Sequence, residues 1–231
     1  MQLSDIEQAL RQVGLTPRGA FHPRPEDNVP GISPWRPAAT VVLAGNAGPD
    51  MWQAFSSQRD PETDLLDSWS FEILSALAVT FDAAALFPFT RPHLPFQRWA
   101  ALAGPCHPSP VGLFVHPDYG LWHGFRGALA LTQRLALPPP DQRPSPCESC
   151  ADKPCLTGCP VSALGGEHHD VGRCTDHIDS NAGADCMSHG CRVRRVCPVG
   201  REYRYASAQA SFHMTSFRRS RLADRAAAKG A

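Results

Sequence analysis

The sequence predicts an α+β protein made of two dissimilar parts. Over residues 1–137, apolar side chains recur with both helical and strand spacing, which indicates helices and strands together. Residues 138–146 are rich in proline and break every periodicity, so they predict an extended linker. Eight of the nine cysteines then follow between residues 147 and 197, which indicates a second, small domain with a different chemistry.

The first part, residues 1–137, predicts helices and strands in alternation. Ser4 can cap a helix that runs to about Val13 and stops at Gly14. The β-branched run at 39–45 is typical of a buried strand, and apolar residues at three- and four-residue steps predict a helix over 60–79. The remaining expectations are an irregular segment at 16–37, a helical turn at 48–55, a strand at 83–89, a short helix at 96–104, and two strands at 111–117 and 125–133 joined by a turn at 118–120.

The cysteine-dense part is expected to form a domain over 147–205, followed by a C-terminal helix and basic tail over 206–231. From Met187 onward, ten Lys and Arg side chains stand against two acidic ones, although the formal net charge of the chain is zero. A basic segment of this kind suits an anionic cofactor, an acidic partner or nucleic acid, and it also suits a solvated helix face.

The sequence shows neither a signal peptide nor a membrane-spanning run, and this indicates the cellular compartment. The first residues resemble a short amphipathic helix rather than a signal peptide, and no apolar run approaches the roughly 20 residues needed to cross a bilayer. The sequence therefore predicts a cytoplasmic protein with no membrane contact. Because disulfides are rare in that compartment, the clustered cysteines are expected to be metal ligands or redox groups.

The cysteine spacing is the strongest signal in the chain. The first run is Cys147-x2-Cys150-x4-Cys155-x3-Cys159-Pro160, and the second contains Cys174, Cys186, Cys191 and Cys197-Pro198. Bacterial ferredoxins carry Cys-x2-Cys-x2-Cys-x3-Cys-Pro, and the fourth cysteine there binds the other cluster. The same crossed pairing predicts one [4Fe–4S] cluster on Cys147, Cys150, Cys155 and Cys197 and another on Cys159, Cys174, Cys186 and Cys191.

Two structural Zn²⁺ sites of the Cys₄ type are the alternative for these eight thiols. Zinc ribbons prefer two separated Cys-x2-Cys pairs, whereas this chain has one, and its two Cys-Pro endings favour iron–sulfur clusters. Cys106 stands apart from the run and is expected to be a small apolar residue rather than a ligand.

A second signal lies upstream, in the stretch PVGLFVHPDYGLWHGFRGALAL at 110–131. Pro117 and Gly120 shape a tight turn that His116 begins. Trp122 offers a flat apolar face with one N–H group, and Arg126 offers a planar fork of donors. A flat macrocycle with amide groups on its rim needs such a mixture, although a packed His-Pro turn also occurs for structural reasons alone.

These residues resemble the family of CblC-type cobalamin-processing proteins, which remove the upper axial ligand of cobalamin. The resemblance lies in GLFVHPDYGLWHGFRGAL, and more faintly in DPETDLLDSWSFEIL and ATVVLAGNAGPDMWQAF, over roughly residues 30–135. It implies a flavin-reductase/nitroreductase-like α+β domain that holds cobalamin in a cleft. It also implies that the pocket is bordered by Gly112, His116, Gly120, Trp122 and Arg126.

The cysteine-dense part is similar to the two-cluster ferredoxin-like module of epoxyqueuosine reductases, a family of corrinoid proteins that modify tRNA. Its eight cysteines follow the family's order of a four-cysteine run, a lone cysteine and a three-cysteine group ending in Cys-Pro. Reductive dehalogenases share the same pairing of a corrinoid domain with a ferredoxin domain. The resemblance implies that the clusters feed electrons to a corrinoid.

Taken together, the sequence predicts an iron–sulfur oxidoreductase of the cobalamin reductase or decyanase type, in which clusters pass electrons to a bound corrinoid. An electron-donor protein is the implied partner, and nucleic acid is not expected. Flavin remains an alternative to the corrinoid. Asp118 and Tyr119, beside the turn, are the candidate proton donors. The alternative functions are a two-cluster electron carrier for a partner protein and reduction of an epoxide in tRNA.

Overall fold

The computed structural model describes residues 1–61, 63, 65–165 and 169–229, and it confirms the α+β class. The chain divides into two compact units, each built from separate stretches: the first from 1–106 and 123–144, the second from 107–122 and 145–231. Residues 107–122 thus group with the cysteine-dense stretch. The domain boundaries expected from the sequence, 1–137, 138–146, 147–205 and 206–231, stay a prediction. None of the described helices is long and apolar enough to span a bilayer.

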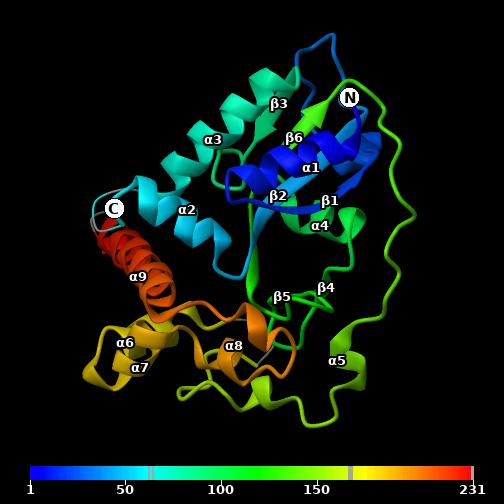
Figure 1. The fold of residues 1–231 in the computed structure, drawn as a ribbon. Coiled ribbons are helices and arrows are strands. Elements are labelled where there is room, and N and C mark those ends of the chain that lie inside the picture. The colour runs from blue at the N-terminus through cyan, green and yellow to red at the C-terminus, as the bar shows by residue number, and fades with distance from the viewer. Residues whose placement is uncertain (62, 64, 166–168, 230–231) are drawn as a thin grey trace. The chain divides into compact units, whose positions relative to one another are not determined.

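The first unit is a four-stranded antiparallel sheet with helices packed on it (Figure 1). The strand order is β1-β2-β6-β3, so strands that are distant in sequence become neighbours at β2 and β6. In chain order its elements are α1 (Leu3–Gln12), β1 (Thr16–Phe21), η1 (Pro25–Asp27), β2 (Thr40–Ala47), α2 (Asp50–Gln58), α3 (Leu66–Thr80), β3 (Ala83–Leu86), α4 (Phe96–Ala103) and β6 (His123–Leu131).

The core of this unit forms on β2, because both faces of that strand are covered. Every residue of β2 is buried, and it pairs with β6 in a register that sets Val42 opposite Leu129. Helices α1 and α4 pack against β1, α2 against β2, and α3 against β3 and β6. A strand buried on both sides needs a continuous apolar run, which is what the 39–45 stretch supplied.

Three expectations from the sequence need correction. Residues 16–21 are not irregular but form edge strand β1, where the pairing register shifts between Pro17 and Ala20. Proline is tolerated at a sheet edge or bulge, so its presence did not exclude a strand. The helix predicted over 60–79 begins at Leu66, after the extended backbone of Leu65; residues 62 and 64 of that prediction lie outside the described residues.

The third correction concerns the predicted hairpin of 111–117 and 125–133. Only Phe114–Val115 (β5) is extended, and it pairs with His107–Pro108 (β4) rather than with β6. Gly112 adopts a positive φ of 74°, and Pro117 has no N–H group to donate, so the strand cannot extend in either direction. β6 instead starts at His123 and pairs with β2 and β3.

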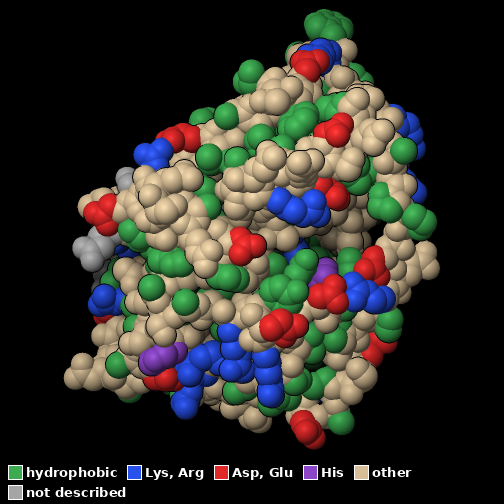
Figure 2. Space-filling model, viewed as in Figure 1, with side chains coloured by type: hydrophobic (Ala, Val, Ile, Leu, Met, Phe, Trp, Pro, Cys, Tyr) green, Lys and Arg blue, Asp and Glu red, His purple; other side chains and the backbone are tan. Residues whose placement is uncertain are grey.

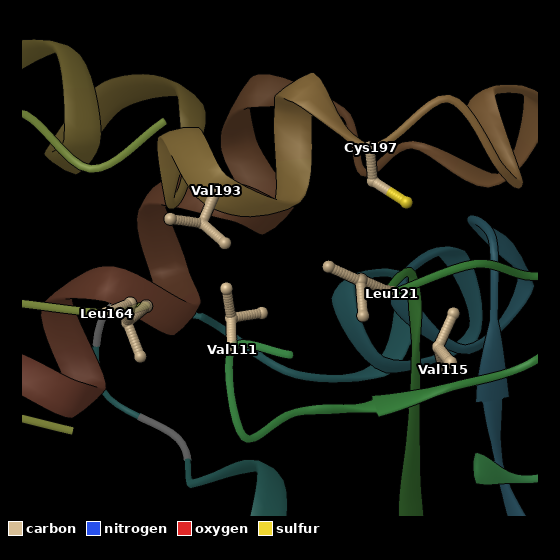
Figure 3. Packing of buried hydrophobic residues seen from close by; sticks show 6 residues of the cluster. All are labelled: Val111, Val115, Leu121, Leu164, Val193 and Cys197. Carbon is tan, nitrogen blue, oxygen red and sulfur yellow. The ribbon is translucent and has the colours of Figure 1, made fainter. Parts of the chain in front are cut away.

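The second unit is a set of short helices and turns around a small apolar cluster. After β4 and β5 its elements are α5 (Pro146–Ser149), η2 (Pro154–Leu156), α6 (Val171–Ile178), η3 (Asn181–Gly183), α7 (Ala184–His189), α8 (Arg192–Val196), η4 (Arg201–Tyr203) and α9 (Ser207–Lys229). Figure 3 shows the cluster, which consists of Val111, Val115, Leu121, Leu164, Val193 and Cys197. Three of these six side chains come from the 107–122 stretch, so this stretch belongs to the unit's core.

Helix α9 runs through the predicted basic tail to Lys229. Two of its arginines have acidic partners near α6: Arg225 pairs with Asp176 at 2.7 Å, and Arg218 pairs with Asp179. Part of the basic tail is therefore explained by ion pairs within the unit. Residues 230 and 231, the end of the predicted tail, lie outside the described residues.

Candidate metal centres

Three cysteines of the first run and the distant Cys197 line one hollow of the second unit. Cys147 lies in α5, Cys155 lies in η2, and Cys197 ends α8, while Cys150 follows α5 directly. The rest of the lining consists of Pro110, Val115, Pro146, Lys153, Pro154, Pro198 and Val199. We call these four cysteines the outer group. They are the same four that the crossed pairing assigned to one cluster.

The thiols of the outer group act on one another electrostatically. Burial is the main cause that raises the pKa values of Cys147, Cys155 and Cys197, and the neighbouring thiols of the group raise each of them further. Lys153 opposes the rise at Cys147. Arg201 and Arg204 oppose it at Cys197. These three thiols therefore hold their protons more tightly than free thiols do, and a bound cation would relieve the repulsion among the thiolates.

The other four cysteines form a second set, which we call the inner group. Cys174 lies in α6, Cys186 in α7 and Cys191 before the first turn of α8, and Cys159 follows η2. The pKa of Cys174 is raised to about 11, first by burial and then by Cys191, Cys159 and Cys186. The three thiols that act on Cys174 are those expected to share a cluster with it.

Backbone amides point at several of these sulfurs. The amide of Ala163 donates to Cys159 Sγ at 3.2 Å. Arg192 donates from its backbone to Cys186, and Val199 donates from its backbone to Cys197. Each such bond stabilises a thiolate, and hydrogen bonds to sulfur are among the factors that set cluster potentials. Both groups therefore have the surroundings that a bound anionic sulfur needs.

All nine cysteines are free thiols in this structure. Among the residues described, no three His, Cys, Asp or Glu side chains come together in an arrangement that could hold a single metal ion. The lining of the outer group contains no carboxylate and no imidazole. An all-thiol donor set suits an iron–sulfur cluster or Zn²⁺ and does not suit Mg²⁺ or Ca²⁺.

The loop at 110–122 borders the outer group, since Pro110 and Val115 line the same hollow. Its turn is closed by a pair of backbone hydrogen bonds between His116 and Gly120, each 2.9 Å long. The buried His116 ring accepts the backbone N–H of Asp118 through Nδ1 at 3.1 Å. The Asp118 carboxylate lies 3.8 Å from the same Nδ1.

The two candidate proton donors, Asp118 and Tyr119, have different surroundings. The Asp118 side chain is half-exposed. Tyr119 stacks on His116 with ring centroids 4.3 Å apart and meets the edge of Tyr203 at 4.7 Å. The pKa of Tyr203 is raised, mainly by burial and secondarily by Tyr119. Asp118 is therefore the group of the turn that solvent reaches most easily.

The residues expected to border a corrinoid pocket differ in accessibility. Gly112 is exposed, and a side chain added there would meet nothing within 4 Å. Gly120 is buried against the Val199 carbonyl, while Trp122 is 2% exposed and packs edge-on against Tyr205 at 5.2 Å. The indole N–H of Trp122 has no hydrogen-bond partner among the described residues. The tryptophan face that was expected to meet a macrocycle is thus covered by protein in this structure.

Arg126, the fifth of these residues, lies on β6 in the first unit. Its Nε donates to Ser70 Oγ at 2.9 Å, and its guanidinium pairs with Asp67 and lies over the Phe89 ring. Three partners already fix its orientation, so Arg126 has a structural role that the sequence did not reveal.

A buried polar cluster of the first unit was also missed. Arg18, only 6% exposed, donates to His123 Nδ1 at 3.0 Å and approaches Cys106 Sγ at 3.8 Å. Cys106 is buried as expected, and burial raises the pKa of its thiol while Arg18 lowers it. Since these residues are separated by 88 and 105 positions, no local pattern could have joined them.

Comparison with known proteins leaves the function open. No protein-family model matches the chain, and no curated protein matches it. Among solved structures, the crystal structure of a C. elegans B12-trafficking protein CblC, a human MMACHC homologue, is similar with a TM-score of 0.47 and 15% sequence identity, over 91% of each chain. A likeness of this size supports no conclusion about activity, so the proposal below rests on the residues of this chain.

Proposed function

We propose that this chain is an iron–sulfur electron-transfer protein that binds two [4Fe–4S] clusters and passes their electrons to a corrinoid. The observation that carries the proposal is the outer group: Cys197 lines one hollow with three cysteines of the first run. A ferredoxin-type crossed pairing requires this arrangement, in which the last cysteine of the second run joins the first three of the other. The electrostatic coupling of Cys174 to the inner group supports the second site.

The surroundings of the thiols favour clusters as occupants. Donor sets made only of cysteine are typical of [4Fe–4S] clusters, and the amide donors at Cys159, Cys186 and Cys197 would stabilise the bound sulfur. When bound, such clusters supply single electrons at a potential that the protein tunes. The cysteines of the two groups would hold the clusters at two separate sites. The surrounding residues would limit the access of water to the outer group.

The corrinoid half of the proposal rests on the 110–122 loop. Its sequence resembles the cobalamin-processing family, and the loop shares Pro110 and Val115 with the lining of the outer group. An acceptor bound at this loop would therefore lie beside the outer cluster. The reaction that fits is reductive removal of an upper axial ligand, with Asp118 as the accessible proton donor of the turn.

Metal analysis of anaerobically purified protein tests the first half. We expect about eight irons and as much acid-labile sulfide per chain. Cys197→Ser should lose the outer cluster and Cys186→Ser the inner one, so each variant should keep about half of the iron. Cys106→Ser, which lies outside both groups, is the matched control and should keep all of it. Zinc without iron would overturn the proposal.

Cobalamin titration into the reconstituted protein tests the second half. We expect the corrin absorption bands to shift on binding and to shift again when the clusters are reduced, as the cobalt accepts electrons. His116→Ala should weaken the first shift, because its ring organises the turn. Corrin bands that stay unchanged at every ratio, with both clusters present, would leave a two-cluster electron carrier for a partner protein.

A further inference from the structure

Two exposed apolar side chains lie next to ligands of the outer group. Leu156 follows Cys155 at the end of η2 and is 40% exposed, and Val196 precedes Cys197 at the end of α8 and is 36% exposed. Helix α8 packs against η2. A side chain on Gly158 would approach a Val196 methyl to 2.8 Å, so the two elements are in close contact. They form one surface, the η2–α8 surface, whose two apolar residues are the chain neighbours of two of the four cysteines.

Positive charge surrounds this surface. The stretch from 192 to 204 has one acid, Glu202, against five arginines: Arg192, Arg194, Arg195, Arg201 and Arg204. Figure 2 shows Lys and Arg side chains gathered in one patch where Figure 1 places α8. Arg201 and Arg204 follow Cys197 by four and seven residues along the chain. The charge is therefore concentrated beside the outer group.

Ion pairs within the unit do not use up this charge. Arg192 and Arg195 share one carboxylate, that of Asp185, so a net positive charge is left there. No ion pair joins Arg194, Arg201 or Arg204 to an acid within the described parts of the chain. This differs from α9, where Arg218 and Arg225 each have an acidic partner of their own. Ion pairs within the unit therefore account for Arg218 and Arg225 of α9, but they do not account for the arginines around η2 and α8.

We propose that the η2–α8 surface is the electron-entry site and docks an acidic electron-transfer protein. This inference rests on the proposed function. Complexes between redox proteins are small and transient, with a limited apolar contact and complementary charges that speed the encounter. In the transfer, the [2Fe–2S]⁺ centre of the donor would lose one electron and become [2Fe–2S]²⁺, and a cluster held by the four cysteines of the outer group would accept that electron, changing from the 2+ to the 1+ state. No proton or bond changes place.

Stopped-flow mixing with an acidic plant-type [2Fe–2S] ferredoxin tests the site. One protein is reduced beforehand, and electron exchange is followed in whichever direction the potentials favour. We expect the second-order rate constant to fall by about tenfold or more between low and high salt, because salt screens steering by opposite charges. Arg192→Glu and Arg201→Glu, on either side of Val196, should each lower the low-salt rate constant severalfold.

Arg219→Glu is the matched control, because Arg219 is equally exposed but lies on α9. It makes the same change in net charge and should leave the rate constant within about twofold. A rate constant independent of salt, or an equal loss in the control, would overturn the docking site. Iron content and the extent of reduction by dithionite report on the clusters themselves. If the clusters were absent from the parent protein and from every variant, the proposed function would be wrong, and not only the docking site.

Discussion

At the scale of single residues, two glycines hold the 110–122 loop against the stretch that follows Cys197. A side chain on Gly120 would approach the Val199 carbonyl oxygen to 2.0 Å, and one on Gly200 would approach the Tyr119 backbone to 2.3 Å. Both residues have a positive φ, of 55° and 69°, which disfavours any side chain. This contact is what places the loop beside the outer group of thiols.

Gly120→Ala should therefore destabilise the second unit by about 2 kcal/mol or more, through a backbone collision added to left-handed strain. Gly112→Ala is the control, because its φ is also positive but the space around it is open. We expect it to cost about 1 kcal/mol. Urea denaturation measures both values, and equal losses in the two variants would show that the contact with Val199 is unimportant.

The raised thiol pKa values predict how the stability of the metal-free fold and the uptake of iron change with pH. Because folding raises the pKa of Cys174 from 9.0 to about 11, its thiol stabilises the metal-free fold below pH 9, and this contribution is lost as pH rises toward 11. Iron loading has the opposite dependence, since each ligand must lose its proton. Iron uptake by the metal-free protein should rise steeply from pH 7.0 to 8.5. Uptake that is independent of pH would contradict this account.

At the scale of elements, sequence periodicity located the buried helices and strands but not their partners. The run at 39–45 identified β2 because a central strand is apolar on both faces. The edge strand β1 was not predicted, because Pro17 and Gly19 usually indicate turns. Both residues are tolerated at a bulge in an edge strand. The pairing of β4 with β5 could not be foreseen, because two-residue strands have no period.

One buried carboxylate joins η1 to α4 and gives a prediction at this scale. Asp27, whose side chain is 4% exposed, accepts the backbone N–H of Arg24 at 2.8 Å and pairs with Arg98 at 2.9 Å. Asp27→Ala should lower the free energy of unfolding by about 3 kcal/mol, because it leaves those donors without their acceptor.

The matched control for Asp27→Ala is Glu72→Ala, which removes a half-exposed carboxylate paired with Arg59. Exposed pairs contribute little, so the control should change the free energy of unfolding by less than about 1 kcal/mol. Urea denaturation compares the two variants. Similar losses in both would mean that burial adds nothing to the Asp27 interaction.

At the scale of the whole molecule, the cysteine spacing divided the eight thiols into two groups, and their role as cluster ligands stays a prediction. It could not predict that residues 107–122 would join the cysteine-dense unit. Val111, Val115 and Leu121 are apolar residues with no signal of their own, and only their packing with Leu164 and Val193 assigns them to that unit. The ion pair of Arg126 could not be predicted either, since its partner Asp67 is 59 residues away.

A fragment of residues 138–231 therefore lacks half of the apolar cluster, although it contains every predicted ligand. We expect it to retain much less iron after anaerobic reconstitution than the full chain, because the outer group would lose the side chains that pack beneath it. Adding residues 107–122 as a synthetic peptide should recover part of the iron. Full loading of the fragment alone would show that the loop is dispensable.

The shared hollow of Cys147, Cys150, Cys155 and Cys197 also fixes an order of events during synthesis. The ribosome releases the first three of these cysteines early, and the proposed ligand set stays incomplete until Cys197 has emerged. All four members of the inner group emerge before that residue. Translation therefore releases the complete inner group first. The outer group, whose cysteines lie on both sides of the inner group in the sequence, is complete only later, when the nascent chain has passed Pro198.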